Sequence, residues 1–142
     1  MTFLTVALLA MQPASPAAAP AAAPTAAPVS KWATKEGDVA IRDFRFRSGE
    51  VMPMVRMHYA TLGTPHRNAK GEIDNAVMVL HGTGGSGKQF LQPQFADELY
   101  GPGQPLDIDR YYIILPDNVG HGGSSKPSDG LRMKFPQYDY AD

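Results

Sequence analysis

The chain has 142 residues, 43% hydrophobic and 19% charged, which is enough for one domain of ordinary globular composition. Its net charge of -1 gives no basic surplus that would attract nucleic acid or anionic lipid, and it contains no cysteine for a disulfide or a thiolate metal site. We therefore expect no nucleic-acid partner, no cofactor and no metal, while the oligomeric state is left open.

The first 30 residues differ from the rest because they carry no charged side chain. Residues 3–11, FLTVALLAM, form an apolar run of signal-peptide length that is too short to span a bilayer. Residues 12–30 are almost entirely alanine and proline, and they offer small-x-small cleavage sites in several registers. No Lys or Arg precedes Phe3, which is atypical. We predict a signal peptide and Ala/Pro-rich linker over 1–30, hence export to the periplasm or outside the cell. The alternative is a linker that is never cleaved.

Two strands are predicted after the linker. Residues 39–46 alternate in side-chain polarity, though imperfectly, and residues 54–62 form a second β-rich run that ends at Gly63. Between them, Ser48-Gly49-Glu50 supplies a turn. A strand, a short turn and a strand indicate an antiparallel hairpin.

The pattern then changes to continuous apolar runs. Residues 76–80, AVMVL, and 111–115, YYIIL, are typical of strands buried on both faces. Between them, residues 89–99 have apolar side chains at helical spacing, with Pro93 near the start. Each run leads into a glycine-rich loop. The predicted class is α/β: an antiparallel hairpin leading into a parallel sheet with covering helices.

The first glycine-rich loop has a phosphate-binding interpretation. Gly82 to Lys88 matches G-x-x-x-x-G-K after a strand, as in nucleotide-binding loops. However, Gln89 stands where a magnesium-binding Ser or Thr is needed, and Pro116 interrupts the approach to Asp117 on the next strand. A P-loop-like nucleotide-binding module is therefore kept as an alternative.

An oxyanion hole is the competing interpretation of the same loop. In acyl transfer, a carbonyl oxygen becomes negative in the transition state, and fixed backbone N–H groups stabilise it. Gly82 and Gly84 flank Thr83 with nothing bulky, so a substrate carbonyl could approach the Thr83 N–H. A glycine-rich turn that only reverses the chain is the third possibility.

Both loops together resemble the α/β-hydrolase superfamily. The first is a strand entering His81-Gly82-Thr83-Gly84-Gly85, and the second reads Pro116-Asp117-Asn118-Val119-Gly120-His121-Gly122-Gly123-Ser124. More narrowly, residues 44–142 resemble the homoserine O-acetyltransferase-like branch, most specifically over residues 101–112. The resemblance implies that Thr83 is an oxyanion donor through its backbone N–H, with Gly82 and Gly84 shaping the loop. It also implies a small ester or acyl substrate.

Two departures from that branch point toward hydrolysis. The biosynthetic acetyltransferases usually carry His-Ala-Leu-Thr-Gly at the first loop and a Gly-Gly-Cys-Tyr-Gly type sequence at the second. A signal peptide also fits poorly with an acetyl-CoA-dependent step in the cytoplasm. We therefore favour an exported serine-type hydrolase that acts through an acyl-enzyme, with a homoserine O-acetyltransferase-type enzyme as the alternative.

The nucleophile of such an enzyme is not encoded here. Ser86 and Ser124 both lack the final glycine of G-x-S-x-G, and the motif occurs nowhere in the chain. One more helix and strand would place it about 25–35 residues beyond Asp142, with the acid and histidine later still. Residues 31–142 are thus expected to be the N-terminal portion of an α/β-hydrolase domain, truncated before the nucleophile elbow and inactive alone. His81 is expected to be structural, His121 a solvated loop residue, and Asp117 a cap within its own turn.

Overall fold

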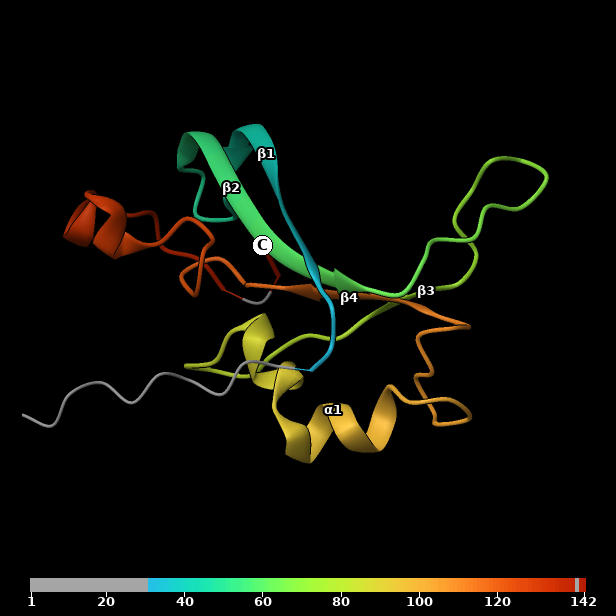
Figure 1. Ribbon diagram of the computed structural model, residues 1–142. Coiled ribbons are helices and arrows are strands. Elements are labelled where there is room, and N and C mark those ends of the chain that lie inside the picture. Colours follow the sequence, from blue (N-terminus) through green and yellow to red (C-terminus); the bar gives the residue numbers. More distant parts are fainter. Residues whose placement is uncertain (1–30, 140) are drawn as a thin grey trace, which may run out of the picture.

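A computed structural model describes residues 31–139 and 141–142, so the predicted signal peptide and linker lie outside the described residues. The strands form one four-stranded sheet in the order β1-β2-β4-β3, with α1 on one side of it (Figure 1). In the described part of the chain, no helix is both long enough and apolar enough to cross a membrane. In chain order the elements are β1 (Lys35–Arg45), β2 (Val51–Leu62), β3 (Ala76–Met78), the 3-10 helix η1 (Gly87–Leu91), α1 (Pro93–Leu99), β4 (Tyr112–Pro116), and the 3-10 helices η2 (Pro127–Asp129) and η3 (Arg132–Lys134).

The predicted hairpin is confirmed as the antiparallel pair of β1 and β2, in which Ile41 lies opposite Val55. Both strands begin earlier than predicted, because the pairing continues to Lys35 opposite Thr61 and to Arg45 opposite Val51. Side-chain alternation is weak at these ends, whereas backbone pairing does not depend on it. Gly49 closes the hairpin turn at φ +88, a conformation that favours glycine.

The centre of the sheet is β4. It pairs antiparallel with β2 and parallel with β3, so that Ile113 lies opposite both Leu62 and Val77. The hairpin therefore leads into a parallel pair within one continuous sheet, as the predicted α/β class requires.

The predicted burial of β3 on both faces is wrong for the residues described. Met78 is 60% exposed and Leu80, just beyond the strand, is 61% exposed. The physical reason is that β3 has only β4 beside it in the described chain and helical cover on one face only. The opposite face forms an open, mainly apolar groove of about 420 Å³, lined among others by Met57, Met78 and Ile114.

The core lies between the covered sheet face and the segment from η1 to α1. Alternation along β4 sends Ile113 and Leu115 to this face, where they are fully buried against Phe90, Ala96 and Tyr100. Burying each such side chain contributes about 1.5–3 kcal/mol. The Tyr100 hydroxyl is buried without a partner among the described residues, and this burial raises the pKa of Tyr100 to about 12.

The predicted helix over 89–99 is divided in two. The 3-10 helix η1 ends at Leu91, Gln92 is extended at φ -72 and ψ 146, and α1 starts with Pro93 as its first residue. A residue before proline is disfavoured in the α region, and proline suits the first helical position. The proline therefore starts the helix rather than continuing one.

Asp107 holds the connection from α1 to β4. Its carboxylate accepts the N–H of Gly103 at 2.7 Å and the N–H of Asp109 at 2.9 Å. The bond from Gly103, then the bond from Asp109, holds the pKa of Asp107 below its usual value. A depressed folded-state pKa stabilises the fold at neutral pH, and this contribution is lost as the pH falls through that pKa.

Gly87 is required by close packing, and we expect Gly87→Ala to lower the free energy of unfolding by about 1–3 kcal/mol. A Cβ at this position would lie 2.6 Å from the carbonyl oxygen of Leu115 in β4, which cannot move without disturbing the sheet. Gly82→Ala is the matched control, because nothing lies within 4 Å of a Cβ there and its stability should change little. Both variants are made in the longer protein that carries this chain, and urea unfolding followed by circular dichroism measures their midpoints. Equal midpoints would contradict the packing argument.

Candidate active site

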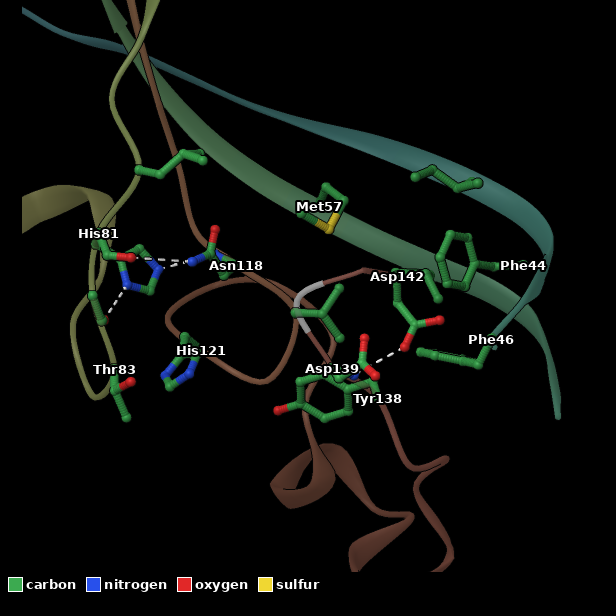
Figure 2. Close-up of a pocket in the computed structure, with 15 residues that line it drawn as sticks. Phe44, Phe46, Met57, His81, Thr83, Asn118, His121, Tyr138, Asp139 and Asp142 are labelled. Carbon is green, nitrogen blue, oxygen red and sulfur yellow. Dashed lines mark hydrogen bonds between the residues drawn. The ribbon is translucent and has the colours of Figure 1, made fainter. Parts of the chain in front are cut away.

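Two glycine-rich loops lie together because they follow the carboxyl ends of the parallel strands β3 and β4. We call residues 81–87 the first loop and residues 117–124 the second loop. A cavity of about 620 Å³ lies between these loops, the hairpin and the C-terminal residues Tyr138, Asp139 and Asp142 (Figure 2). The hairpin contributes an apolar wall that includes Phe44, Phe46 and Met57. The loops contribute polar lining residues, namely His81, Thr83, Asn118 and His121.

A tight turn at Gly82-Thr83-Gly84-Gly85 shapes the first loop. The N–H of Gly85 donates to the carbonyl of Gly82 at 3.1 Å, and Gly84 has φ +79. A positive φ at the third position is typical of a type II turn and explains the glycine there. Gly82 has open space where a Cβ would stand, so local packing does not explain that glycine.

Thr83 is exposed and lines the cavity, as Figure 2 shows. Among the described residues, no hydrogen bond engages the N–H of Thr83 or of Gly84. A donor that is fixed in a turn and not engaged by the protein is what an incoming carbonyl oxygen needs. The geometry is compatible with the predicted oxyanion role of Thr83, and that role stays a prediction.

Asp117 joins the two loops. Its buried carboxylate accepts the N–H of Gly123 at 2.6 Å and the N–H of Gly87 at 2.7 Å. The first bond lies within its own turn, as predicted. The second reaches the end of the first loop, which the sequence did not indicate. Gly122, at φ +49, has no room for a Cβ because the Asp117 carboxylate occupies that space.

His81 is buried and makes a second link between the loops. Its Nε2 accepts the N–H of Asn118 at 3.0 Å, and its Nδ1 lies 2.8 Å from the carbonyl oxygen of Gly82. The Asn118 side-chain amide also donates to the His81 carbonyl at 3.2 Å. Both ring nitrogens therefore contact backbone groups, in agreement with the structural role expected for His81.

His121 lies closer to the site than a solvated loop residue would. It is half-buried, lines the cavity, and stands nearly perpendicular to the His81 ring, with ring centroids 5.3 Å apart. The glycines on either side of His121 in the sequence did not indicate that its ring would line the cavity.

The two serines have no nucleophile geometry. Ser124 is fully buried, and its hydroxyl donates to the Asp117 carbonyl at 2.6 Å and accepts the N–H of His58 at 2.8 Å. Ser86 precedes η1 as its N-cap residue, at an extended backbone conformation. Ser124 thus anchors the second loop to β2.

The geometry disfavours the phosphate-binding alternative. A phosphate would need the loop N–H groups, but the Asp117 carboxylate already accepts that of Gly87 and would repel an anion there. Lys88 is exposed and lies 3.5 Å from Glu36 in β1. The loop is also followed by a 3-10 helix of 5 residues rather than an α-helix.

Comparisons with known proteins point to one group of enzymes. No family model matches the chain. A "Probable acyltransferase" of Methanothermobacter thermautotrophicus is 33% identical over 103 residues, covering 72% of this chain and 31% of the relative. A "Homoserine O-acetyltransferase" of Pelobacter propionicus is 34% identical over 103 residues, covering 66% and 27%. The chain thus spans about a third or less of the length of these curated relatives.

Solved structures agree on the fold. The acetyl esterase MekB matches with a TM-score of 0.54 and 26% identity over 67% of this chain and 25% of that chain. An acetylester hydrolase from Corynebacterium glutamicum gives a TM-score of 0.59 at 23% identity, over 73% of this chain and 29% of that chain. The mixed four-stranded sheet thus matches solved structures of the α/β-hydrolase fold. The chain belongs to the α/β-hydrolase superfamily, in its homoserine O-acetyltransferase-like branch.

Proposed function

We propose that this chain forms the oxyanion-binding side of an exported serine-type enzyme that hydrolyses small esters through an acyl-enzyme. The observation that carries the proposal is the Thr83 N–H, which no described residue engages, on a turn at the edge of the 620 Å³ cavity. When a serine attacks the substrate carbonyl, its π electrons move to oxygen, and the Thr83 N–H donates to the resulting anion.

The rest of the machinery lies outside these 142 residues in this proposal, since they contain no G-x-S-x-G. The apolar wall formed by Phe44, Phe46 and Met57 would contact the acyl group or the alcohol part of the ester. The polar groups of the loops would face the reacting carbonyl. An apolar wall with a few polar groups suits a small neutral ester.

Acyl transfer to homoserine is the second candidate, and it has a specific observation in its favour. Several curated relatives bear the name homoserine O-acetyltransferase or O-succinyltransferase. Both reactions share the acyl-enzyme and the oxyanion hole. They differ in the acyl donor, which is an ester or a thioester, and in whether water or a hydroxyl group accepts the acyl group.

A burst experiment tests the shared step. The protein that carries this chain together with a serine elbow is mixed with p-nitrophenyl acetate, and p-nitrophenol is followed by absorbance. We expect a rapid burst near one equivalent per protein, followed by slower turnover, both abolished by a fluorophosphonate. Absence of a burst and of turnover would contradict the proposal. Adding acetyl-CoA and homoserine then separates the two candidates by whether O-acetylhomoserine forms.

Export is a separate part of the proposal, and it rests on the charge-free residues 1–30. In a Gram-negative host, the protein should accumulate outside the cytoplasm with a new N-terminus between about residue 16 and residue 31. Mass spectrometry of the cell fractions measures this. An intact Met1 on cytoplasmic protein would contradict export and leave the acyl-enzyme chemistry untouched.

A further inference from the structure

We propose that His81 is a positioning residue whose Nδ1–H tautomer sets the direction of the Thr83 N–H. The inference rests on the proposed oxyanion role of Thr83. It concerns the peptide unit between Gly82 and Thr83, because the carbonyl that His81 contacts and the N–H that would bind the oxyanion belong to this same peptide.

The hydrogen bonds determine which ring nitrogen carries the proton. The Asn118 N–H is only a donor, so Nε2 of His81, 3.0 Å away, must be the acceptor and carry no proton. In a neutral imidazole the proton is then on Nδ1, and Nδ1–H donates to the Gly82 carbonyl at 2.8 Å. A carbonyl oxygen can only accept, so the second contact requires the same tautomer.

Because the Gly82 carbonyl and the Thr83 N–H belong to one planar peptide, fixing the direction of the carbonyl also fixes the direction of the N–H. The described chain has no cis peptide, and in a trans peptide the C=O and the N–H point in opposite directions. The Gly82 oxygen accepts two donors, the His81 ring and the Gly85 N–H at 3.1 Å, and so its direction is fixed. The Thr83 N–H must then point away from the His81 ring. Two bonds to the carbonyl also polarise the peptide and make its N–H a better donor.

The ring itself has little freedom to move. His81 is 5% exposed, its carbonyl accepts the Asn118 side-chain amide, and the His121 ring stands against it (Figure 2). Asn118 directly follows Asp117, whose carboxylate ties the second loop to Gly87. The orientation of the Thr83 peptide therefore depends on the second loop through the His81 ring.

Two substitutions of His81 distinguish the roles of its two ring nitrogens. An asparagine amide can place an N–H near the position of Nδ1, whereas a glutamine reaches the position of Nε2. We expect His81→Gln to lower kcat for p-nitrophenyl acetate at least tenfold with KM within about threefold, because the oxyanion forms only in the transition state. His81→Asn should recover kcat to within about threefold of the unmodified enzyme.

The measurement is made on the active protein, with kcat divided by the number of sites that react to completion with a fluorophosphonate, so that misfolded protein is not counted. His66→Asn and His66→Gln are the matched controls, since His66 pairs with Asp74 on an exposed loop and is absent from the cavity lining. Both should have unchanged kcat.

A direct readout is the ¹⁵N NMR spectrum of the His81 ring, which we expect to show the Nδ1–H tautomer at neutral pH. The Nε2–H tautomer, or equal kcat values for the Asn and Gln variants, would overturn the inference. These outcomes differ from failure of the proposed function, in which the unmodified enzyme shows no burst or Thr83→Pro retains full activity.

Discussion

Thr83→Pro is expected to lower kcat about a hundredfold or more, while Thr83→Ala leaves kcat within about threefold. Proline removes the backbone N–H that would bind the oxyanion, whereas alanine removes only the hydroxyl. The comparison is sharp because Thr83 is the second residue of a turn in which Gly84 has φ +79. Proline is common at that position of a type II turn, so the loop should keep its shape.

The assay is steady-state hydrolysis of p-nitrophenyl acetate by the enzyme that contains this chain and a nucleophile. Thermal unfolding of both variants serves as the control, and we expect midpoints close to that of the unmodified protein. If the alanine variant were as inactive as the proline variant, the hydroxyl of Thr83 would be the working group and the assignment to the N–H would be wrong.

Residues 31–142 produced alone are expected to be inactive and to lack a cooperative fold. Acyl transfer needs an activated nucleophile and a base, and this stretch holds no nucleophile elbow. The apolar surface of the groove of about 420 Å³ remains exposed to solvent, as do the side chains of Met78 and Leu80 at the β3 edge. An exposed apolar edge strand pairs readily with other copies, so we expect aggregation or a loosely packed state.

Binding of the dye ANS, the shape of the thermal transition and esterase activity test this expectation together. We expect strong ANS fluorescence, a broad transition and no turnover. A monomer that melts sharply and turns over p-nitrophenyl acetate in a fluorophosphonate-sensitive manner would contradict both parts of the prediction.

Local sequence patterns predicted the hairpin, the central strand β4 and the two glycine-rich loops, because each depends on neighbouring residues. The alternation in β1, the apolar run of β4 and the glycine clusters are visible within a few positions. The division of the predicted helix into η1 and α1 could not be read from the sequence. The apolar spacing of Phe90, Leu91, Phe95 and Leu99 is the same whether or not Pro93 begins a new helix.

The arrangement of the site could not be predicted in the same way. The bond from Gly87 to Asp117 joins residues 30 positions apart, and the bonds between His81 and Asn118 join residues 37 apart. No local pattern marks either pair. Burial of β3 was predicted from its apolar side chains, yet hydrophobicity says only that a strand can be covered and not which segment covers it.

The link between the loops also has a consequence for the order of folding. The hairpin can form as soon as its own residues are available, since its contacts are near in sequence. The Thr83 turn, by contrast, takes its fixed orientation only when residues 117–118 have reached it. During synthesis on the ribosome, the first loop would therefore lack its final conformation until about 30 further residues have been added. At about 5–20 residues per second, this is a delay of roughly 2–6 s. The amide protons of Gly85 and Gly87, which are held in hydrogen bonds, should likewise become protected from exchange later than those of the hairpin.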